Sequence, residues 1–266
     1  MIKVNEKRIN FEKGITLHQL KERFKPNADI LIYNGFPLDI DKAIEDGDEI
    51  IFIKRGEIPS KEELESLMVS RHTPGVHDKV KKSVVGIAGL GGLGTVIAVA
   101  LARIGIGKLI IADFDVVEPS NLNRQQYFIN QIGKLKVEAT KENLSMINPY
   151  VEIETHNIVL NYDNVADVFK ETKILVEAFD RADMKAMLVN SFLEHYPDRY
   201  MVCASGLAGY NDANTIQARK YGKGLYIIGD TSSAAQPGRG LMAPRVGVAA
   251  SHQANKVLEI ILGEEL

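Results

Sequence analysis

The sequence contains a single cysteine, Cys203, among its 266 residues. One thiol excludes an internal disulfide bond and a zinc site built on several thiolates, so we expect no structural zinc. The formal net charge of −3 is close to neutral and gives no support to nucleic acid or an anionic membrane as the main partner. No apolar run approaches the length of a membrane span, and the first residues lack the pattern of a signal peptide. We therefore expect a soluble, cytoplasmic protein.

The first 55 residues differ in pattern from the rest of the chain. Short strand-like runs are broken by turn signals at Asn34-Gly35 and Asp46-Gly47-Asp48, and a helical stretch has Thr16 as its N-cap candidate. The strand-like runs are 2–4, 30–33 and 49–53, and the helical stretch is 16–24. This pattern predicts a small α+β module of ubiquitin-like size. A linker-like stretch at 55–60 follows, and Ser60-Lys61-Glu62-Glu63 matches a capping box that opens a helix to about Val69. We place two domains at residues 1–57 and 58–266.

From residue 83 onward, strand-like runs alternate with helical patterns. Strands are expected near 83–88, 108–113, 151–156, 173–178 and 200–205, and helices near 92–105, 133–147, 162–170 and 181–196. Two more strand-like runs (215–218 and 225–228), a Gly/Ser/Pro-rich crossover at 230–245 and a final amphipathic helix at 246–262 complete the chain. The alternation predicts an α/β fold with a doubly wound, mostly parallel, Rossmann-like sheet. Its ligand would lie outside the carboxyl ends of the strands.

The most informative motif is the run Gly-Ile-Ala-Gly-Leu-Gly-Gly-Leu-Gly at 86–94, between a predicted strand and a predicted helix. Gly89, Gly91 and Gly94 fit the dinucleotide fingerprint. Glycine permits the tight strand-to-helix turn, and it lets backbone N–H groups approach a phosphate at the positive end of the helix. Alone, the same motif also fits a turn that only packs a helix tightly on a strand.

Two carboxylates follow the second predicted strand of this region. Asp113 lies about 20 residues past the glycine loop, which is the spacing of a ribose-binding acid. Asp115 comes two residues later, and an Asp-x-Asp after a strand also fits a solvated turn. A dehydrogenase needs only one acidic residue at this place.

The next residues add an amide and two cations. Asn121, Arg124 and Gln125 lie within one helical turn of one another, so a short helix could aim them at one site. Arg124 can clamp phosphate oxygens bidentately, and Lys136, in Gly-Lys-Leu-Lys, can add a point charge. Each cation taken alone also fits a solvated surface. Together these groups indicate a triphosphate and a displacement at phosphorus.

The fourth predicted strand ends at Asp180. A carboxylate at this end of a parallel sheet could hold Mg²⁺ between phosphates, whereas a helix N-cap is the structural alternative. Cys203 lies near the end of the next strand, and we interpret it as a buried strand cysteine rather than a thiol that carries substrate.

These residues, in this order, resemble the ThiF/MoeB/HesA family, the bacterial relatives of ubiquitin-activating enzymes. The resemblance runs from about residue 60 to residue 266, and it joins the glycine loop, Asp-Phe-Asp at 113–115, Ser-Asn-Leu-Asn-Arg-Gln at 120–125, Gly-x-x-Lys at 133–136 and the strand-end Asp180. It implies an adenylyltransferase that uses Mg·ATP to adenylate the C-terminal carboxylate of a ubiquitin-like sulfur carrier. A ThiS-like carrier in thiamine biosynthesis is the expected substrate.

The resemblance also implies roles for individual residues. The catalytic set would be Arg124, Lys136, Asp180 as the Mg²⁺ ligand, and Arg71. Arg71 is similar in place to an arginine that family dimers insert into the neighbouring subunit's site, and a surface arginine is the alternative. The ATP-binding set would be Gly89, Gly91, Gly92, Gly94, Asp113, Asp115, Asn121 and Gln125. A homodimer follows from the resemblance alone. No general base is needed, because a carboxylate is already ionised at neutral pH.

The chain departs from the family pattern in three places. It lacks the two Cys-x-x-Cys pairs that bind zinc in many members, and its crossover contains no cysteine. The N-terminal module looks like a ThiS/MoaD carrier, but it continues past Arg55-Gly56-Glu57 and so has no terminal Gly-Gly to activate. We expect a docking or regulatory role for it in cis.

Three other functions stay open at this point. The enzyme could activate another carboxylate, on a modified tRNA nucleoside or a molybdopterin-type carrier. It could be a non-catalytic partner that binds a carrier, although the joint presence of Asp113, Arg124, Lys136 and Asp180 argues against a dead site. An NAD(P) oxidoreductase fits the motifs least well.

Overall fold

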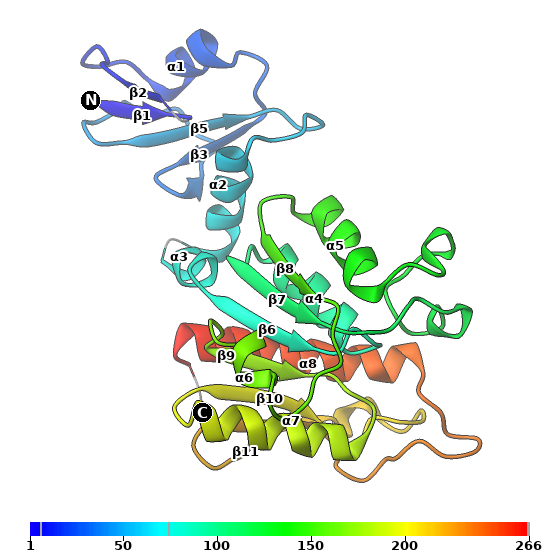
Figure 1. Cartoon of the computed structure of the whole chain (residues 1–266). Coiled ribbons are helices and arrows are strands. Elements are labelled where there is room, and N and C mark those ends of the chain that lie inside the picture. The colour runs from blue at the N-terminus through cyan, green and yellow to red at the C-terminus, as the bar shows by residue number, and fades with distance from the viewer. Residues whose placement is uncertain (6, 74, 265–266) are drawn as a thin grey trace. The chain divides into compact units, whose positions relative to one another are not determined.

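The computed structural model describes residues 1–5, 7–73 and 75–264. They form two compact units, Met1–Lys79 and Val80–Leu266 (Figure 1). Each unit has its own hydrophobic core and is described by itself.

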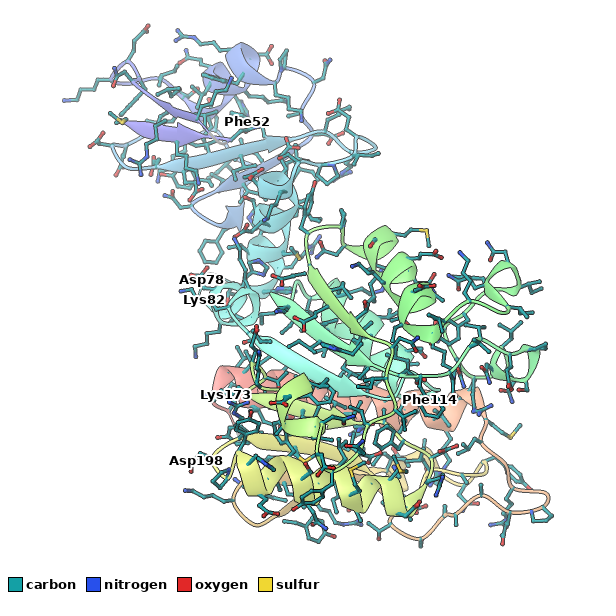
Figure 2. The ribbon with its side chains drawn as sticks, viewed as in Figure 1. Phe52, Asp78, Lys82, Phe114, Lys173 and Asp198 are labelled. Atoms are coloured by element: carbon teal, nitrogen blue, oxygen red, sulfur yellow. The ribbon has the colours of Figure 1, made fainter. Side chains whose placement is uncertain are left out.

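The first unit has a ubiquitin-like arrangement of strands around one helix. Within the described residues its five-stranded sheet has the order β2-β1-β5-β3-β4, with β1 and β5 parallel and the other pairs antiparallel. The elements are β1 (Ile2–Val4), β2 (Lys7–Ile9), α1 (Leu17–Phe24), β3 (Ile30–Tyr33), β4 (Phe36–Pro37) and β5 (Glu49–Ile53). Thr16 caps α1 in a capping box with Gln19, so the predicted N-cap is confirmed. The fully buried Phe52 lies in the core beneath α1 (Figure 2).

Local turn chemistry sets the path of this unit. Asn34 and Gly35 join β3 to β4 as a two-residue hairpin with φ of +49° and +82°, as expected for an Asn-Gly turn. The helix α2 (Lys61–His72) begins at the predicted capping box, in which Ser60 and Glu63 bond reciprocally.

Helix α2 packs against the face of the sheet opposite α1. Its Leu67 contacts the apolar cluster of Ile32, Ile51 and Ile53, and because side chains alternate along β5, these residues face away from α1. The first unit therefore continues past the ubiquitin-like strands to Lys79 and includes the start of α3 (Val76–Lys81). The predicted domain boundary between residues 57 and 58 stays a prediction.

The second unit is built on a mostly parallel sheet, which confirms the predicted fold class. In the described part of the chain this seven-stranded sheet has the order β11-β12-β10-β9-β6-β7-β8, and only β11 runs antiparallel to its neighbour. The strands are β6 (Val84–Ala88), β7 (Lys108–Ala112), β8 (Glu152–His156), β9 (Ile174–Glu177), β10 (Tyr200–Ala204), β11 (Gln217–Tyr221) and β12 (Leu225–Gly229). The chain moves outward from β6 through β7 to β8 and then returns to β9 on the other side of β6. The β6–β9 pair is therefore the topological switch point, where such sheets bind ligands.

Helices cover both faces of this sheet (Figure 1). On one face α4 (Gly94–Arg103), α5 (Lys136–Ile147) and α8 (Ala243–Leu262) share the larger core, whereas α6 (Val165–Val168) and α7 (Ala182–His195) pack on the other face. Figure 2 shows Phe114 at the carboxyl edge of the sheet and Lys173 and Asp198 at the opposite edge. Across the described ranges, no helix combines the length and apolar character needed to cross a membrane.

Several predicted boundaries differ from the observed ones. The helix expected at 162–170 is the single turn α6, and the strand expected at 215–218 lies further on as β11, because residues 213–215 form a short 3-10 helix. The final helix begins at Ala243, three residues before the predicted start, with Pro244 in its first turn, where the missing N–H of proline costs nothing.

Candidate functional site

The loop between β6 and α4 requires glycine at two positions. Gly89 has a φ of +94°, and a Cβ there would lie 2.9 Å from the carbonyl oxygen of Ala178. A Cβ on Gly94 would collide with the carbonyl oxygen of Gly89. Only glycine therefore allows the chain to turn directly from strand into helix while lying against the end of β9.

The start of α4 presents free backbone donors. Its N-cap, Leu93, makes no side-chain hydrogen bond, and in the described part of the chain no acceptor is bound to the N–H groups of Gly91 and Gly92. These groups lie at the positive end of the helix, so they are available to an anionic ligand.

Asp113, the predicted ribose acid, lies at the end of β7 against this loop. Its Oδ2 accepts a hydrogen bond from the backbone N–H of Leu90 (2.6 Å), and its Oδ1 accepts one from the N–H of Asp115 (2.8 Å). The carboxylate thus ties the end of β7 to the glycine loop.

Lys136 and Asp115 form an ion pair, which could not be predicted from their positions in the sequence. The Nζ of Lys136 donates to Asp115 Oδ2 at 2.8 Å, and the Lys136 backbone N–H donates to the Asp115 carbonyl at 2.9 Å. The lysine side chain is 8% exposed and the aspartate 48%, so the ammonium is held at the edge of the site rather than in bulk water. The solvated alternative for Lys136 is therefore excluded.

A short 3-10 helix, η1 (Pro119–Asn121), starts the segment that carries the next three candidates. Asn121 is buried and its Oδ1 accepts the backbone N–H of Glu118 (3.0 Å), which stabilises the turn. Arg124 is half-buried and its Nη1 donates to Asn123 Oδ1 (2.9 Å). Its aliphatic part packs over the glycine loop, because a Cβ on Gly92 would lie 3.3 Å from its Cγ.

Gln125 points toward the same loop. It is 7% exposed, and a Cβ on Gly91 would lie 3.9 Å from its Nε2. Its Oε1 is buried and has no hydrogen-bond partner in the described structure. A buried acceptor without a partner is costly unless a ligand or water satisfies it, so this atom can accept a hydrogen bond from a bound ligand or water.

Asp180 lies three residues beyond the end of β9 and is exposed. The N-cap of α7 is Arg181, which makes no side-chain cap, so Asp180 is not the capping residue of that helix. Because β6, β7 and β9 are adjacent parallel strands, their carboxyl ends bring Asp180, the glycine loop and Asp113 to one edge at the switch point.

Arg71 belongs to the first unit, where it lies exposed in the last turn of α2, and its action on a neighbouring subunit stays a prediction. In the described ranges no group of three or more His, Cys, Asp or Glu side chains is placed to hold a metal ion. A magnesium ion at Asp180 would therefore need oxygen ligands from a bound nucleotide, which is the usual way Mg²⁺ is held in phosphate sites.

Glu177 is a functional candidate that the sequence analysis missed. It is fully buried at the end of β9, and both of its carboxylate oxygens bond Lys185 Nζ (2.8 and 3.0 Å). Its oxygens also accept the N–H groups of Phe179 (2.6 Å) and Ala204 (3.2 Å). Burial raises the pKa of Glu177, although the Lys185 ammonium acts in the opposite direction. This pair anchors the segment that leads to Asp180. In the sequence, the one feature that could have pointed to Glu177 is its place as an acid within the apolar run 174–178.

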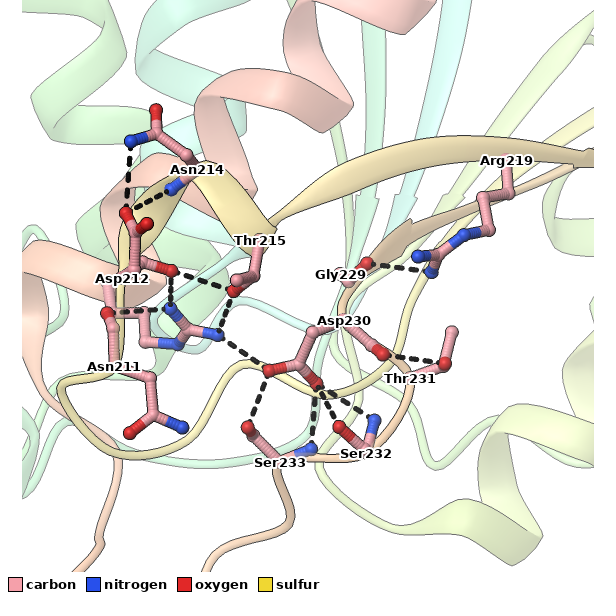
Figure 3. Close-up of polar contacts among 11 residues, drawn as sticks. Asn211, Asp212, Asn214, Thr215, Arg219, Gly229, Asp230, Thr231, Ser232 and Ser233 are labelled. Carbon is pink, nitrogen blue, oxygen red and sulfur yellow. Dashed lines mark hydrogen bonds and ion pairs between the residues drawn. The ribbon is translucent and has the colours of Figure 1, made fainter.

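A second buried ion pair joins the two ends of the crossover, residues 230–245 (Figure 3). Arg245, 3% exposed in its side chain, donates from Nη2 to Asp230 Oδ2 at 2.7 Å, and it also bonds the carbonyls of Asn211 and Asp212. Burial opposes ionisation of Asp230, but hydrogen bonds from Ser233 and Ser232 outweigh it and lower the pKa of the carboxyl well below its usual range. The two ends of the crossover are thus fixed to each other.

Cys203 is buried on β10, as predicted. It is 6% exposed, and burial together with the charge of Glu177 raises the pKa of its thiol. A neutral, buried thiol is a poor nucleophile.

Sequence comparisons agree with this architecture. The model of the ThiF family matches residues 65–266, and the model described as ThiS-like ubiquitin matches residues 1–56. Ubiquitin-like modifier-activating enzyme 5 of Caenorhabditis elegans is 37% identical over 126 residues, which is 47% of this chain and 29% of that protein. The enzyme of the same name from Drosophila melanogaster is 44% identical over 99 residues, 36% of this chain and 24% of that protein. The matches thus span less than a third of these relatives.

Solved structures share the fold. The Escherichia coli tRNA N6-threonylcarbamoyladenosine dehydratase TcdA, in complex with AMP, superposes with a TM-score of 0.69 at 20% identity, covering 79% of this chain and 99% of that chain. E. coli MccB with succinimide has a TM-score of 0.56 at 25% identity, covering 71% of this chain and 59% of that chain. Because the ThiF model covers most of the sequence and the fold agrees with it, the chain belongs to the ThiF family, with a ThiS-like module at its N-terminus.

Proposed function

We propose that the chain catalyses the ATP-dependent adenylylation of the C-terminal carboxylate of a ubiquitin-like sulfur carrier of the ThiS kind, with release of pyrophosphate, in thiamine biosynthesis. The observation that carries this proposal is the meeting of the glycine loop, Asp113, Lys136 and Asp180 at the carboxyl edge of one parallel sheet. Membership of the ThiF family supports the reaction class, and the ThiS-like module supports the class of partner.

The residues of this edge fit a nucleoside triphosphate. The N–H groups of Gly91 and Gly92 would bind phosphate oxygens at the start of α4, and Asp113 would accept the ribose hydroxyls from its place beside Leu90. The unpartnered Oε1 of Gln125 needs a donor, which the nucleotide or its water can supply.

Charge neutralisation is the main chemical task of the site. A carboxylate attacking the α-phosphate brings two anions together, so positioning and cations must lower the barrier. Arg124 and Lys136 would bind the triphosphate, with Asn121 and Asp115 holding the segments that carry them. Magnesium bound through Asp180 would neutralise phosphate oxygens and stabilise the leaving pyrophosphate.

Asp115 has a distinct part in this arrangement. By pairing with Lys136 it keeps a buried ammonium in position before any phosphate arrives. Such preorganisation means that the cation does not need to be ordered when ATP binds. We propose that the phosphate then shares the lysine with Asp115.

ATP–pyrophosphate exchange with radiolabelled pyrophosphate tests the proposal. We expect exchange that requires Mg²⁺ and a ThiS-like carrier with a free C-terminal Gly-Gly, and none with the same carrier lacking its two terminal glycines. Parallel reactions with a MoaD-like carrier and with modified tRNA identify a different carboxylate substrate. Binding of carrier with no exchange under any of these conditions would indicate a non-catalytic partner and overturn the proposal.

A further inference from the structure

Tyr127 is a buried tyrosine whose hydroxyl bonds the backbone of the glycine loop in the candidate site. The residue is 6% exposed and follows the segment that carries Arg124 and Gln125. Its hydroxyl donates to the carbonyl oxygen of Leu90 at 2.9 Å and lies 3.2 Å from the Oγ1 of Thr140. It therefore touches both the glycine loop and α5.

The Leu90 residue is held from two sides. Its N–H donates to Asp113 and its C=O accepts from Tyr127. The carbonyl of Leu90 and the N–H of Gly91 belong to one planar, trans peptide unit, so they point in opposite directions. By fixing the carbonyl, the Tyr127 hydroxyl fixes the direction of the Gly91 N–H, one of the free donors of the loop.

Thr140 links the Tyr127 hydroxyl to α5, the helix that begins with Lys136. It lies on α5 one turn after Lys136, and both residues are buried. The Tyr127 hydroxyl thus bridges the glycine loop and the helix that presents the Lys136 ammonium. Thr95 makes a parallel link, because its Oγ1 donates to the Gly91 carbonyl (2.7 Å) and accepts the N–H of Gln126 (3.2 Å).

We propose that Tyr127 is a positioning residue of the nucleotide site, which orients the Gly91 N–H and holds the glycine loop in register with the segments that carry Arg124 and Lys136. This inference rests on the proposed function. Burial raises the pKa of the Tyr127 hydroxyl, so it stays protonated and able to donate at neutral pH.

The test compares Tyr127→Phe with Tyr196→Phe in the full chain. Tyr196 makes the same kind of bond, from its hydroxyl to the Ala166 carbonyl at 3.0 Å, but it lies at the end of α7, away from the glycine loop. Isothermal calorimetry with Mg·ATP should show a Kd about tenfold higher for Tyr127→Phe, equivalent to about 1.4 kcal/mol. Tyr196→Phe should lower the melting temperature by a similar amount but leave the Kd unchanged.

Substitutions of Thr140 provide a second measurement that does not depend on the folding of Tyr127→Phe. Thr140→Val should raise the Kd for ATP by roughly twofold to threefold, about 0.4–0.7 kcal/mol, whereas Thr140→Ser, which keeps the hydroxyl, should bind like the wild type. In exchange assays the KM for ATP should rise in Tyr127→Phe and the KM for the carrier should not.

The outcomes separate this inference from the proposed function. If the wild-type chain bound no ATP, the proposed function itself would be refuted. A wild type that binds ATP, with Tyr127→Phe within twofold of it, would overturn the role of Tyr127 alone. An equal rise in Kd for Tyr196→Phe would show a general loss of stability and would also overturn it.

Discussion

The ion pair at the base of the crossover allows a prediction whose size follows from the structure. Replacing Asp230 with Asn keeps the side-chain shape but removes one acceptor oxygen. The amide oxygen can still accept the backbone N–H groups of Ser232 and Ser233, which Oδ1 now binds at 2.8 and 2.7 Å. The amide NH₂ group must then face Arg245, so two donors oppose each other where Oδ2 accepted a bond at 2.7 Å.

The expected loss is about 3 kcal/mol in the free energy of unfolding. Removing one partner of a buried ion pair costs about 3–5 kcal/mol, because the other charge stays buried. Arg245 cannot lose its proton, and its side chain is only 3% exposed. It keeps the carbonyls of Asn211 and Asp212 as acceptors, which places the loss at the lower end of this range.

Asp198→Asn is the matched control for this substitution. Asp198 pairs with Lys223 at 3.4 Å, but both side chains are almost fully exposed, at 88% and 87%. An exposed pair contributes about 0–1 kcal/mol, so the control should unfold nearly as the wild type does. Urea unfolding followed by circular dichroism suits the chain, which contains no tryptophan. A loss under about 1 kcal/mol for Asp230→Asn would refute the reasoning.

The pH dependence of this loss has a definite sign. The folded state lowers the pKa of Asp230, so the stabilising contribution is complete above the unfolded-state pKa of about 4 and decreases as the pH falls below it. The difference in the free energy of unfolding between the wild type and Asp230→Asn should therefore stay constant over a plateau of about three pH units, from about pH 5 to about pH 8, and should narrow in stronger acid. A difference that widens in acid would contradict the assigned ionisation.

Three further predictions concern activity. Arg124→Ala and Asp180→Ala should each lower pyrophosphate exchange by about 10²-fold, because Arg124 would neutralise phosphate directly and Asp180 would hold the Mg²⁺ that does so; unchanged exchange in Asp180→Ala would show the metal assignment to be wrong. Mixing Arg71→Ala subunits with Asp180→Ala subunits should restore part of the exchange if Arg71 acts in a neighbouring subunit, and no recovery in a confirmed mixed dimer would count against that role. Deleting residues 1–57 should weaken carrier-dependent exchange if the module docks the carrier; unchanged carrier KM and turnover would leave it only a stabilising part.

Local features were predictable from the sequence because their causes are local. The N-cap at Thr16, the capping box at Ser60 and the turn at Asn34-Gly35 depend on residues within four positions of one another. Each strand and helix from residue 83 onward has its own local pattern, and their alternation along the chain predicted the parallel sheet. By contrast, β2 and β4 were not predicted, because neither strand has a fully buried residue and neither shows the buried–exposed alternation of β1.

Partners across the fold could not be predicted. Lys136 and Asp115 were both candidates, but their pairing depends on the path of the residues between them, which no local pattern fixes. Glu177 pairs with Lys185 on the helix that follows its strand, and Asp230 pairs with Arg245 across the whole crossover. The choice of partner is a property of the tertiary structure, which the sequence pattern of one segment does not contain.

The most direct test of the central claim is the covalent product itself. The chain is incubated with Mg·ATP and a ThiS-like carrier that ends in a free Gly-Gly, and the carrier is examined by intact-mass spectrometry. We predict a carrier heavier by one adenylyl group (AMP less one water), formed by the wild type and strongly reduced with Asp180→Ala. An unmodified carrier, in the presence of a wild-type chain that binds both ATP and carrier, would contradict the account.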